Sequence, residues 1–198
     1  YIDNGNNTNG DHGDLKVIGN STPRYEYSFR LGADYKGFDF SIYCQGIGKR
    51  KIWGAGQLAI PGWNAKEGAM PETFCKDYWT EDNTDAYYPR AWDLGGSNTG
   101  FTMQRQSKYL LNMAYLRVKN INFGYTFPQK WMKKAYINNL RVYMSLENFF
   151  TFDHLRGLPI DPEAISGYSM FSDNYNLGRT GTGTPVFKSL SFGLQLSF

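Results

Sequence analysis

The stretch from Phe187 to Phe198 reads F-K-S-L-S-F-G-L-Q-L-S-F and decides the fold class. From Leu190 onward every second residue is apolar, and the apolar positions are Leu190, Phe192, Leu194, Leu196 and Phe198. The residues between them are Ser191, Gly193, Gln195 and Ser197. A period of two places successive side chains on opposite faces of an extended strand. We therefore expect a β-strand here with one apolar face and one polar face.

Four earlier segments show the same alternation, at about residues 24-35, 38-47, 115-127 and 139-152. Turn-forming residues bound each of them, which is typical of strands. The clearest turn is Lys36-Gly37, a two-residue connection in which glycine supplies the positive φ that a tight hairpin needs. With residues 186-198, the sequence predicts five strands and an all-β fold.

The expected connections between these strands are short on one side and long on the other. The short ones are Lys36-Gly37 and residues 128-138; the long ones are about residues 1-23, 48-114 and 153-185. Short periplasmic turns, long extracellular loops and aromatic residues near the strand ends are typical of transmembrane β-barrels. The same alternating faces also fit a second hypothesis, a soluble aromatic-rich β-sandwich that binds carbohydrate.

The third segment breaks its own pattern in its first half. Leu116 and Val118 fall on the polar face there, while Arg117 and Lys119 fall on the apolar face. A β-bulge explains this irregularity. Alternatively, the strand leaves the bilayer near Asn120 and turns Arg117 and Lys119 toward anionic lipid headgroups. The sequence leaves both explanations open.

Composition excludes several classes of protein. Among 198 residues, 17% are aromatic, the net charge is +3, and no run of about 18 apolar residues occurs. The small net charge does not favour nucleic-acid binding, and a mean hydropathy of −0.53 is compatible with a barrel whose lumen and loops are polar. The opening residues lack the features of a signal peptide, so we expect a fragment of a longer chain. The two cysteines, Cys44 and Cys75, are expected to be unpaired.

Candidate site residues concentrate in the first long loop. The candidates for ligand or partner contact are Trp63, Trp79, Tyr87, Tyr88 and Trp92, because aromatic faces stack on sugars and anchor protein interfaces. The alternative is that they pack the loop on itself. Asp82 and Asp85 are weak calcium candidates, since an EF-hand glycine and a bidentate glutamate are missing at the required spacing. No catalytic residue, cofactor motif or other metal site is predicted, so we do not expect an enzyme.

Several stretches together resemble one known family. They are V-I-G-N-S-T-P-R-Y (17-25), Y-K-G-F-D-F-S-I-Y-C-Q-G (35-46), D-Y-W-T-E-D-N-T-D-A-Y-Y-P-R (77-90), Y-L-R-V-K-N-I-N-F-G-Y-T-F-P (115-128), L-R-V-Y-M-S-L-E-N-F-F-T-F (140-152), D-P-E (161-163) and S-F-G-L-Q-L-S-F (191-198). In order and spacing they resemble the C-terminal barrel segment of SusC-like TonB-dependent transporters, the outer-membrane nutrient importers of Bacteroidetes.

This resemblance implies a barrel of 22 strands, of which this chain holds the last five, without the plug domain. It implies a SusD-like surface lipoprotein and TonB as partners, contact with outer-membrane lipid and lipopolysaccharide, and uptake of oligosaccharides or oligopeptides. The residues Leu194, Leu196 and Phe198 resemble a barrel-assembly signal. Five strands cannot close a bacterial barrel, which needs at least about eight. We therefore expect the first and last strands to pair with strands outside this chain.

Overall fold

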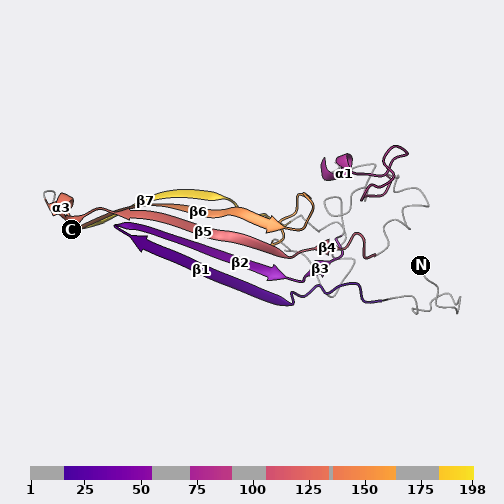
Figure 1. Ribbon diagram of the computed structural model, residues 1–198, viewed down its shortest axis with the longest axis horizontal. Helices are drawn as coiled ribbons and strands as arrows, with labels where there is room; N and C mark the ends of the chain where they lie inside the picture. Colours follow the sequence, from indigo (N-terminus) through magenta and orange to yellow (C-terminus); the bar gives the residue numbers. More distant parts are fainter. Residues whose placement is uncertain (1–15, 55–71, 91–105, 134–135, 164–182) are drawn as a thin grey trace.

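A computed structural model describes residues 16–54, 72–90, 106–133, 136–163 and 183–198. Five strands form one antiparallel sheet in the order β1-β2-β5-β6-β7. Their bounds are β1 Tyr25–Tyr35, β2 Phe38–Gly48, β5 Tyr115–Thr126, β6 Asn139–Asp153 and β7 Ser189–Ser197. Figure 1 shows them side by side in a single long layer, with β1 at one edge and β7 at the other. The predicted all-β fold is confirmed.

Smaller elements lie at the two ends of this sheet. A two-stranded sheet of β3 (Lys51–Ile52) and β4 (Leu111–Asn112) and the helix α1 (Glu72–Lys76) lie at one end, and α3 (Gln129–Met132) lies at the other (Figure 1). We call the first the loop end and the second the short-turn end. Within residues 48-114, expected as a long connection, β3 and β4 therefore pair their backbone groups. Among the described residues, no helix is long and apolar enough to cross a membrane.

The two faces of the five-stranded sheet differ sharply in polarity. Cross-strand pairs such as Ile42↔Ile121 and Val142↔Leu194 share the apolar face, and pairs such as Ser41↔Asn122 and Ser145↔Ser191 share the polar face. The apolar face carries Phe29, Leu31, Phe40, Ile42, Phe123, Val142, Met144, Leu190, Phe192, Leu194 and Leu196. Many of these side chains are exposed: Leu31 by 62% and Leu194 by 60%. No described element packs on this face, so a soluble sandwich is not supported by the described part of the chain.

A bulge resolves the irregular first half of β5. The register shifts between Tyr43 and Cys44 on β2 and between Val118 and Asn120 on β5. One extra residue on a strand inverts the faces of every side chain beyond it. Val118 therefore pairs with Cys44 on the apolar face, and Arg117 pairs with Gln45 on the polar face. The bulge hypothesis is confirmed.

Aromatic side chains cluster at the short-turn end of the apolar face. The ring centroids lie 4.5 Å apart for Phe38 and Tyr125, 5.8 Å for Phe38 and Phe123, and 5.0 Å for Tyr125 and Phe127. Trp131 on α3 extends the group, with its ring 6.4 Å from that of Phe127. Such a band is typical of the aromatic girdle at a membrane interface.

The buried cores lie at the loop end instead of on the sheet. One core cluster is formed by Ile52, Leu111, Met113, Leu155, Leu158 and Ile160, with Trp53 packed against it. A second consists of Phe74, Tyr88 and Tyr109. The connections at this end therefore contain packed cores of their own, attached to the ends of β2, β5 and β6 (Figure 1).

Candidate functional site at the loop end

An aromatic cluster at the loop end contains two of the residues that the sequence singles out. Tyr87 lies edge-on to Tyr88 at 5.0 Å and edge-on to Tyr109 at 5.5 Å between ring centroids. Tyr88 also contacts Phe74 of α1, with centroids 5.7 Å apart. Edge-to-face contacts of this kind stabilise a cluster beyond simple area burial. We call Phe74, Tyr87, Tyr88 and Tyr109 the aromatic cluster.

Cationic and polar groups fix the position of Tyr87. The guanidinium of Arg156 lies 3.9 Å from the centroid of the Tyr87 ring, within the range of a cation–π contact. The Tyr87 hydroxyl donates a hydrogen bond to the backbone carbonyl of Lys108. Burial raises the pKa of Tyr87 and raises the pKa of Tyr109 to about 12, the Arg156 charge opposing the shift at Tyr87. These hydroxyls therefore stay protonated at neutral pH.

A small cavity of about 200 Å³ adjoins this cluster. Tyr87, Tyr88 and Tyr109 line one part of it, and Leu155, Leu158 and His154 line another. Tyr88 is only 4% exposed, and its hydroxyl has no hydrogen-bond partner among the described residues. A buried polar group without a partner is uncommon and costs free energy. The cavity is therefore lined in part by aromatic side chains, and the buried Tyr88 hydroxyl beside it has no partner among the described residues.

A buried ion-pair network ties the second long loop to the sheet. Arg117 of β5 contacts Asp161 at 2.6 Å and Glu163 at 2.5 Å, and its Nε donates to Thr151 of β6 at 2.9 Å. Lys119 pairs with the same Glu163 at 2.5 Å. The side chains of Arg117 and Asp161 are 4% and 7% exposed. The hypothesis that Arg117 and Lys119 face lipid headgroups is wrong, because the bulge turns Arg117 to the polar face and two carboxylates engage both cations.

Asp161 is the hub of this network. Its carboxylate also accepts hydrogen bonds from the backbone N–H of Glu163 at 2.9 Å and of Val186 at 3.1 Å. Burial alone would raise the pKa of Asp161, but the hydrogen bonds from Arg117 and from these two N–H groups lower it below its ordinary value. Asp161 thus holds together β5, its own loop and the segment that leads into β7. We call Arg117, Lys119, Asp161 and Glu163 the charge latch.

The remaining predicted site residues lie as follows. The Trp79 N–H donates to the carbonyl of Tyr88 at 3.1 Å, so Trp79 borders the aromatic cluster. Trp63 and Trp92 lie outside the described residues. Asp82 and Asp85 are exposed, and no group of three or more potential metal ligands occurs in the described ranges, so the weak calcium hypothesis gains no support.

The residues proposed as an assembly signal lie on or beyond β7. Leu194 and Leu196 pair with Val142 and Leu140 on the apolar face. Phe198 follows the last strand and is 82% exposed. These positions do not test an assembly role, which stays a prediction.

Sequence reasoning did not single out Tyr109, Arg156 or the charge latch. Two signals for the latch were present: the D-P-E stretch at 161-163, and the arginine and lysine that broke the alternation of β5. Buried cations require buried carboxylates as partners, so these two anomalies point to each other. Tyr109 and Arg156 have no such signal, because both lie in segments without periodicity.

No family model matches this chain. Among curated proteins it is similar to the TonB-dependent receptor P3 of Formosa agariphila, with 27% identity over 186 residues, which is 93% of this chain. It is also similar to the TonB-dependent receptor P39 of the same organism, with 25% identity over 73% of this chain. The chain spans 17% and 14% of the length of these two relatives.

Solved structures of the RagAB peptide importer have the same fold. The closed-closed state matches with a TM-score of 0.63 and 25% identity, and the open-open state with a TM-score of 0.61 and 24% identity. Each match covers 92% of this chain and 18% of the importer chain. The resemblance to a SusC-like TonB-dependent transporter is confirmed. The single-layered antiparallel sheet is accordingly similar to part of such a transporter, as the alternating strands predict.

Proposed function

We propose that this SusC-like segment is part of an outer-membrane active importer for bulky nutrients. The observation that carries this proposal is the exposed apolar face of the five-stranded sheet. Leu31, Leu190 and Leu194 are each more than half exposed, although they alternate with polar residues on a well-formed sheet. Such a face is stable in lipid, and the likeness to TonB-dependent receptors supports that environment.

The orientation of the sheet follows from its two unlike ends. The loop end, with residues 1-23, 48-114 and 153-185, is proposed to face the extracellular side, and the short-turn end the periplasm. Long extracellular loops and short periplasmic turns are the usual arrangement in outer-membrane barrels. The aromatic girdle at the short-turn end then marks the periplasmic interface of the outer membrane. Both edges, β1 and β7, are proposed to pair with strands elsewhere in the transporter, since an open edge in lipid leaves backbone groups unpaired.

The aromatic residues that the sequence singles out in the first long loop are proposed to contact the lid or the nutrient. The candidates are Trp63, Trp79, Tyr87, Tyr88 and Trp92, and the lid is a SusD-like lipoprotein. A lid covers a whole rim, so we expect it to use more of this surface than the nutrient does. Energy reaches the transporter through TonB and a plug that these residues do not include. The proposed transporter moves its nutrient by gating and not by covalent chemistry.

The relatives decide only which class of nutrient is tested first. The RagAB structures are those of a peptide importer, so oligopeptides come first and oligosaccharides second. Deleting the gene of the full-length transporter should abolish growth on one of these classes as sole source, and the wild-type gene should restore it. Equal growth of the deletion strain on every peptide and glycan fraction would contradict the import proposal.

Two single substitutions test the site itself. Tyr88→Phe removes only the hydroxyl without a partner, so folding should be unaffected while uptake falls if that hydroxyl binds the nutrient. Trp79→Ala tests lid contact by pull-down of the SusD-like protein. Trp131→Ala is the matched control, because Trp131 is 61% exposed at the opposite end of the sheet. If substitutions at all five candidates leave both uptake and lid capture unchanged, these aromatics only pack the loops.

A further inference from the structure

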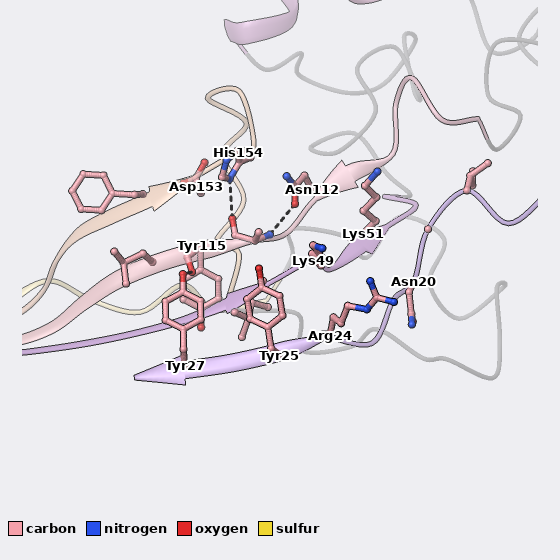
Figure 2. A pocket seen from close by; sticks show the side chains of 17 residues that line it. Asn20, Arg24, Tyr25, Tyr27, Lys49, Lys51, Asn112, Tyr115, Asp153 and His154 are labelled. Atoms are coloured by element: carbon pink, nitrogen blue, oxygen red, sulfur yellow. Dashed lines mark hydrogen bonds between the residues drawn. The ribbon is translucent and has the colours of Figure 1, made fainter. Parts of the chain in front are cut away.

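A second and larger pocket, of about 930 Å³, opens where the strands meet the loops. Figure 2 shows Tyr25 and Tyr27 of β1 standing along one side of it. Leu116 of β5 and Phe152 of β6 line the pocket as well. All four residues belong to the apolar face, since they pair with Gly48, Gly46 and each other across the sheet. These four residues therefore give the pocket a wall from the face proposed to contact lipid, while Ile47 and Tyr115, which also line it, belong to the polar face.

The aromatic wall is held in place by its neighbours. The Tyr27 hydroxyl donates to the backbone carbonyl of Tyr115 at 3.2 Å, two strands away. Gly48 lies beneath the Tyr25 ring, and a Cβ added there would come within 2.2 Å of a ring carbon. The glycine thus allows the ring to lie across β2, an arrangement known from aromatic residues that cover strand glycines. The two rings form one wall of the pocket, and the Tyr27 hydroxyl points across β2 toward β5.

Three cations line the loop side of the same pocket. They are Arg24, Lys49 and Lys51, all labelled in Figure 2. Two of the three backbones are held by hydrogen bonds: the Arg24 N–H donates to the Gly48 carbonyl at 3.2 Å, and the Lys51 N–H donates to the Asn20 carbonyl at 2.8 Å. No carboxylate of the described residues pairs with these three side chains. The one carboxylate in the lining, that of Asp153, accepts the Leu155 N–H at 2.9 Å.

We propose that this pocket binds the phosphorylated headgroup of an outer-leaflet glycolipid, the lipid A part of lipopolysaccharide. Arg24, Lys49 and Lys51 would bind the phosphate, and the tyrosine rings would contact the sugar and the first acyl carbons. Basic residues at a membrane surface attract anionic headgroups, and aromatic rings belong at the same depth. A lipid fits better than a soluble anion because the apolar walls continue directly into the lipid-facing sheet. This inference rests on the proposed membrane location of the sheet.

The test uses the full-length transporter reconstituted in nanodiscs. Binding of bisphosphorylated lipid A is measured by native mass spectrometry for the wild type and for the triple variant Arg24→Gln, Lys49→Gln, Lys51→Gln. A control triple variant, Lys36→Gln, Lys130→Gln, Lys133→Gln, removes the same charge at the short-turn end. Each basic residue near a membrane surface contributes about 1 kcal/mol, or roughly fivefold in affinity. We therefore expect at least a tenfold loss in the first variant and less than a twofold loss in the control.

Further arms separate the sources of the anion. Lipid A stripped of its phosphates should bind the wild type as weakly as bisphosphorylated lipid A binds the first variant. Inorganic phosphate at millimolar concentration should not displace lipid A. Equal binding by the two triple variants, or displacement by free phosphate, would overturn the proposal. Nutrient uptake measured in parallel keeps the two proposals apart, because loss of lipid A binding with uptake intact leaves the import function standing.

Discussion

At the scale of single residues, the charge latch is the most consequential feature of the loop end. Arg117 is buried on the polar face and makes three charge-assisted contacts, to Asp161, Glu163 and Thr151. Hydrogen bonds between ionised groups are shorter and stronger than neutral ones. The latch therefore determines how residues 153–163 fold back on the strands, and with them the wall of the small cavity beside Tyr88.

Arg117→Ala should destabilise the folded transporter by about 3–5 kcal/mol, because the buried Asp161 carboxylate loses its ion-pair partner while Glu163 keeps only Lys119. The measurement is thermal unfolding of the full-length protein in detergent. Glu72→Gln is the matched control: it breaks the Glu72–Lys76 pair, whose side chains are 80% and 70% exposed, and should leave the unfolding temperature unchanged. Equal effects of the two substitutions would show that the latch is not a buried network in the assembled protein.

The stabilisation by Asp161 should depend on pH. Because the pKa of Asp161 is lowered in the folded state, its contribution is fully present above its ordinary value of 3.8 and is lost as pH falls through the depressed folded value. We expect the difference in unfolding temperature between wild type and Asp161→Asn to stay constant between pH 7 and pH 5. The difference should shrink below about pH 3.8. A difference that persists unchanged into strong acid would contradict an ionised Asp161.

At the scale of elements, the strands were the most predictable part of the chain. Alternation identifies strand position because a period of two separates the apolar face of a strand from its polar face. The sequence also showed the irregularity at Leu116 to Lys119. The alternation of side chains alone did not distinguish a bulge from a strand that leaves the bilayer. The choice depends on the partner strands, whose register at Cys44 and Phe150 places Val118 on the apolar face.

The long connections were less predictable than the strands. β3 and β4 are only two residues each, too short for any periodicity, and their pairing joins Lys51–Ile52 to Leu111–Asn112 across the whole first loop. The aromatic cluster likewise brings together Phe74, Tyr88 and Tyr109, which are far apart in sequence. Composition predicts that aromatics gather in this loop. It does not predict which of them are buried against one another.

A charge placed on the apolar face should be costly, while the same charge on the polar face should be mild. Leu194→Arg should destabilise the barrel by about 2–4 kcal/mol if Leu194 lies near the bilayer midplane. Ser191→Arg, on the same strand but facing Ser145 on the polar face, should cost far less. A folding titration of both full-length variants in lipid vesicles measures the two costs. Equal costs would reject the assignment of the two faces.

At the scale of the whole molecule, the five-stranded sheet and the loop end differ in how their apolar residues are covered. The strands form a single layer whose apolar face no described element covers, which is the observation behind the proposed contact with lipid. The buried clusters are at the loop end, where the aromatic cluster, the charge latch and the basic pocket all lie. This division is the basis of the proposal that the sheet lies in the membrane and that the loop end contacts partners.

The most direct test of this account is the accessibility of single spin labels along β7 in the full-length transporter. Labels are placed at successive positions from 190 to 196 after Cys44 and Cys75 are replaced by serine, and the protein is reconstituted in lipid vesicles. Relaxation by oxygen, which partitions into lipid, should be high at 190, 192, 194 and 196 and low at 191, 193 and 195. Relaxation by a water-soluble nickel chelate should show the opposite alternation. Labels equally accessible to nickel on both faces, or shielded from both reagents on the apolar face as in a protein core, would contradict a lipid-facing barrel wall.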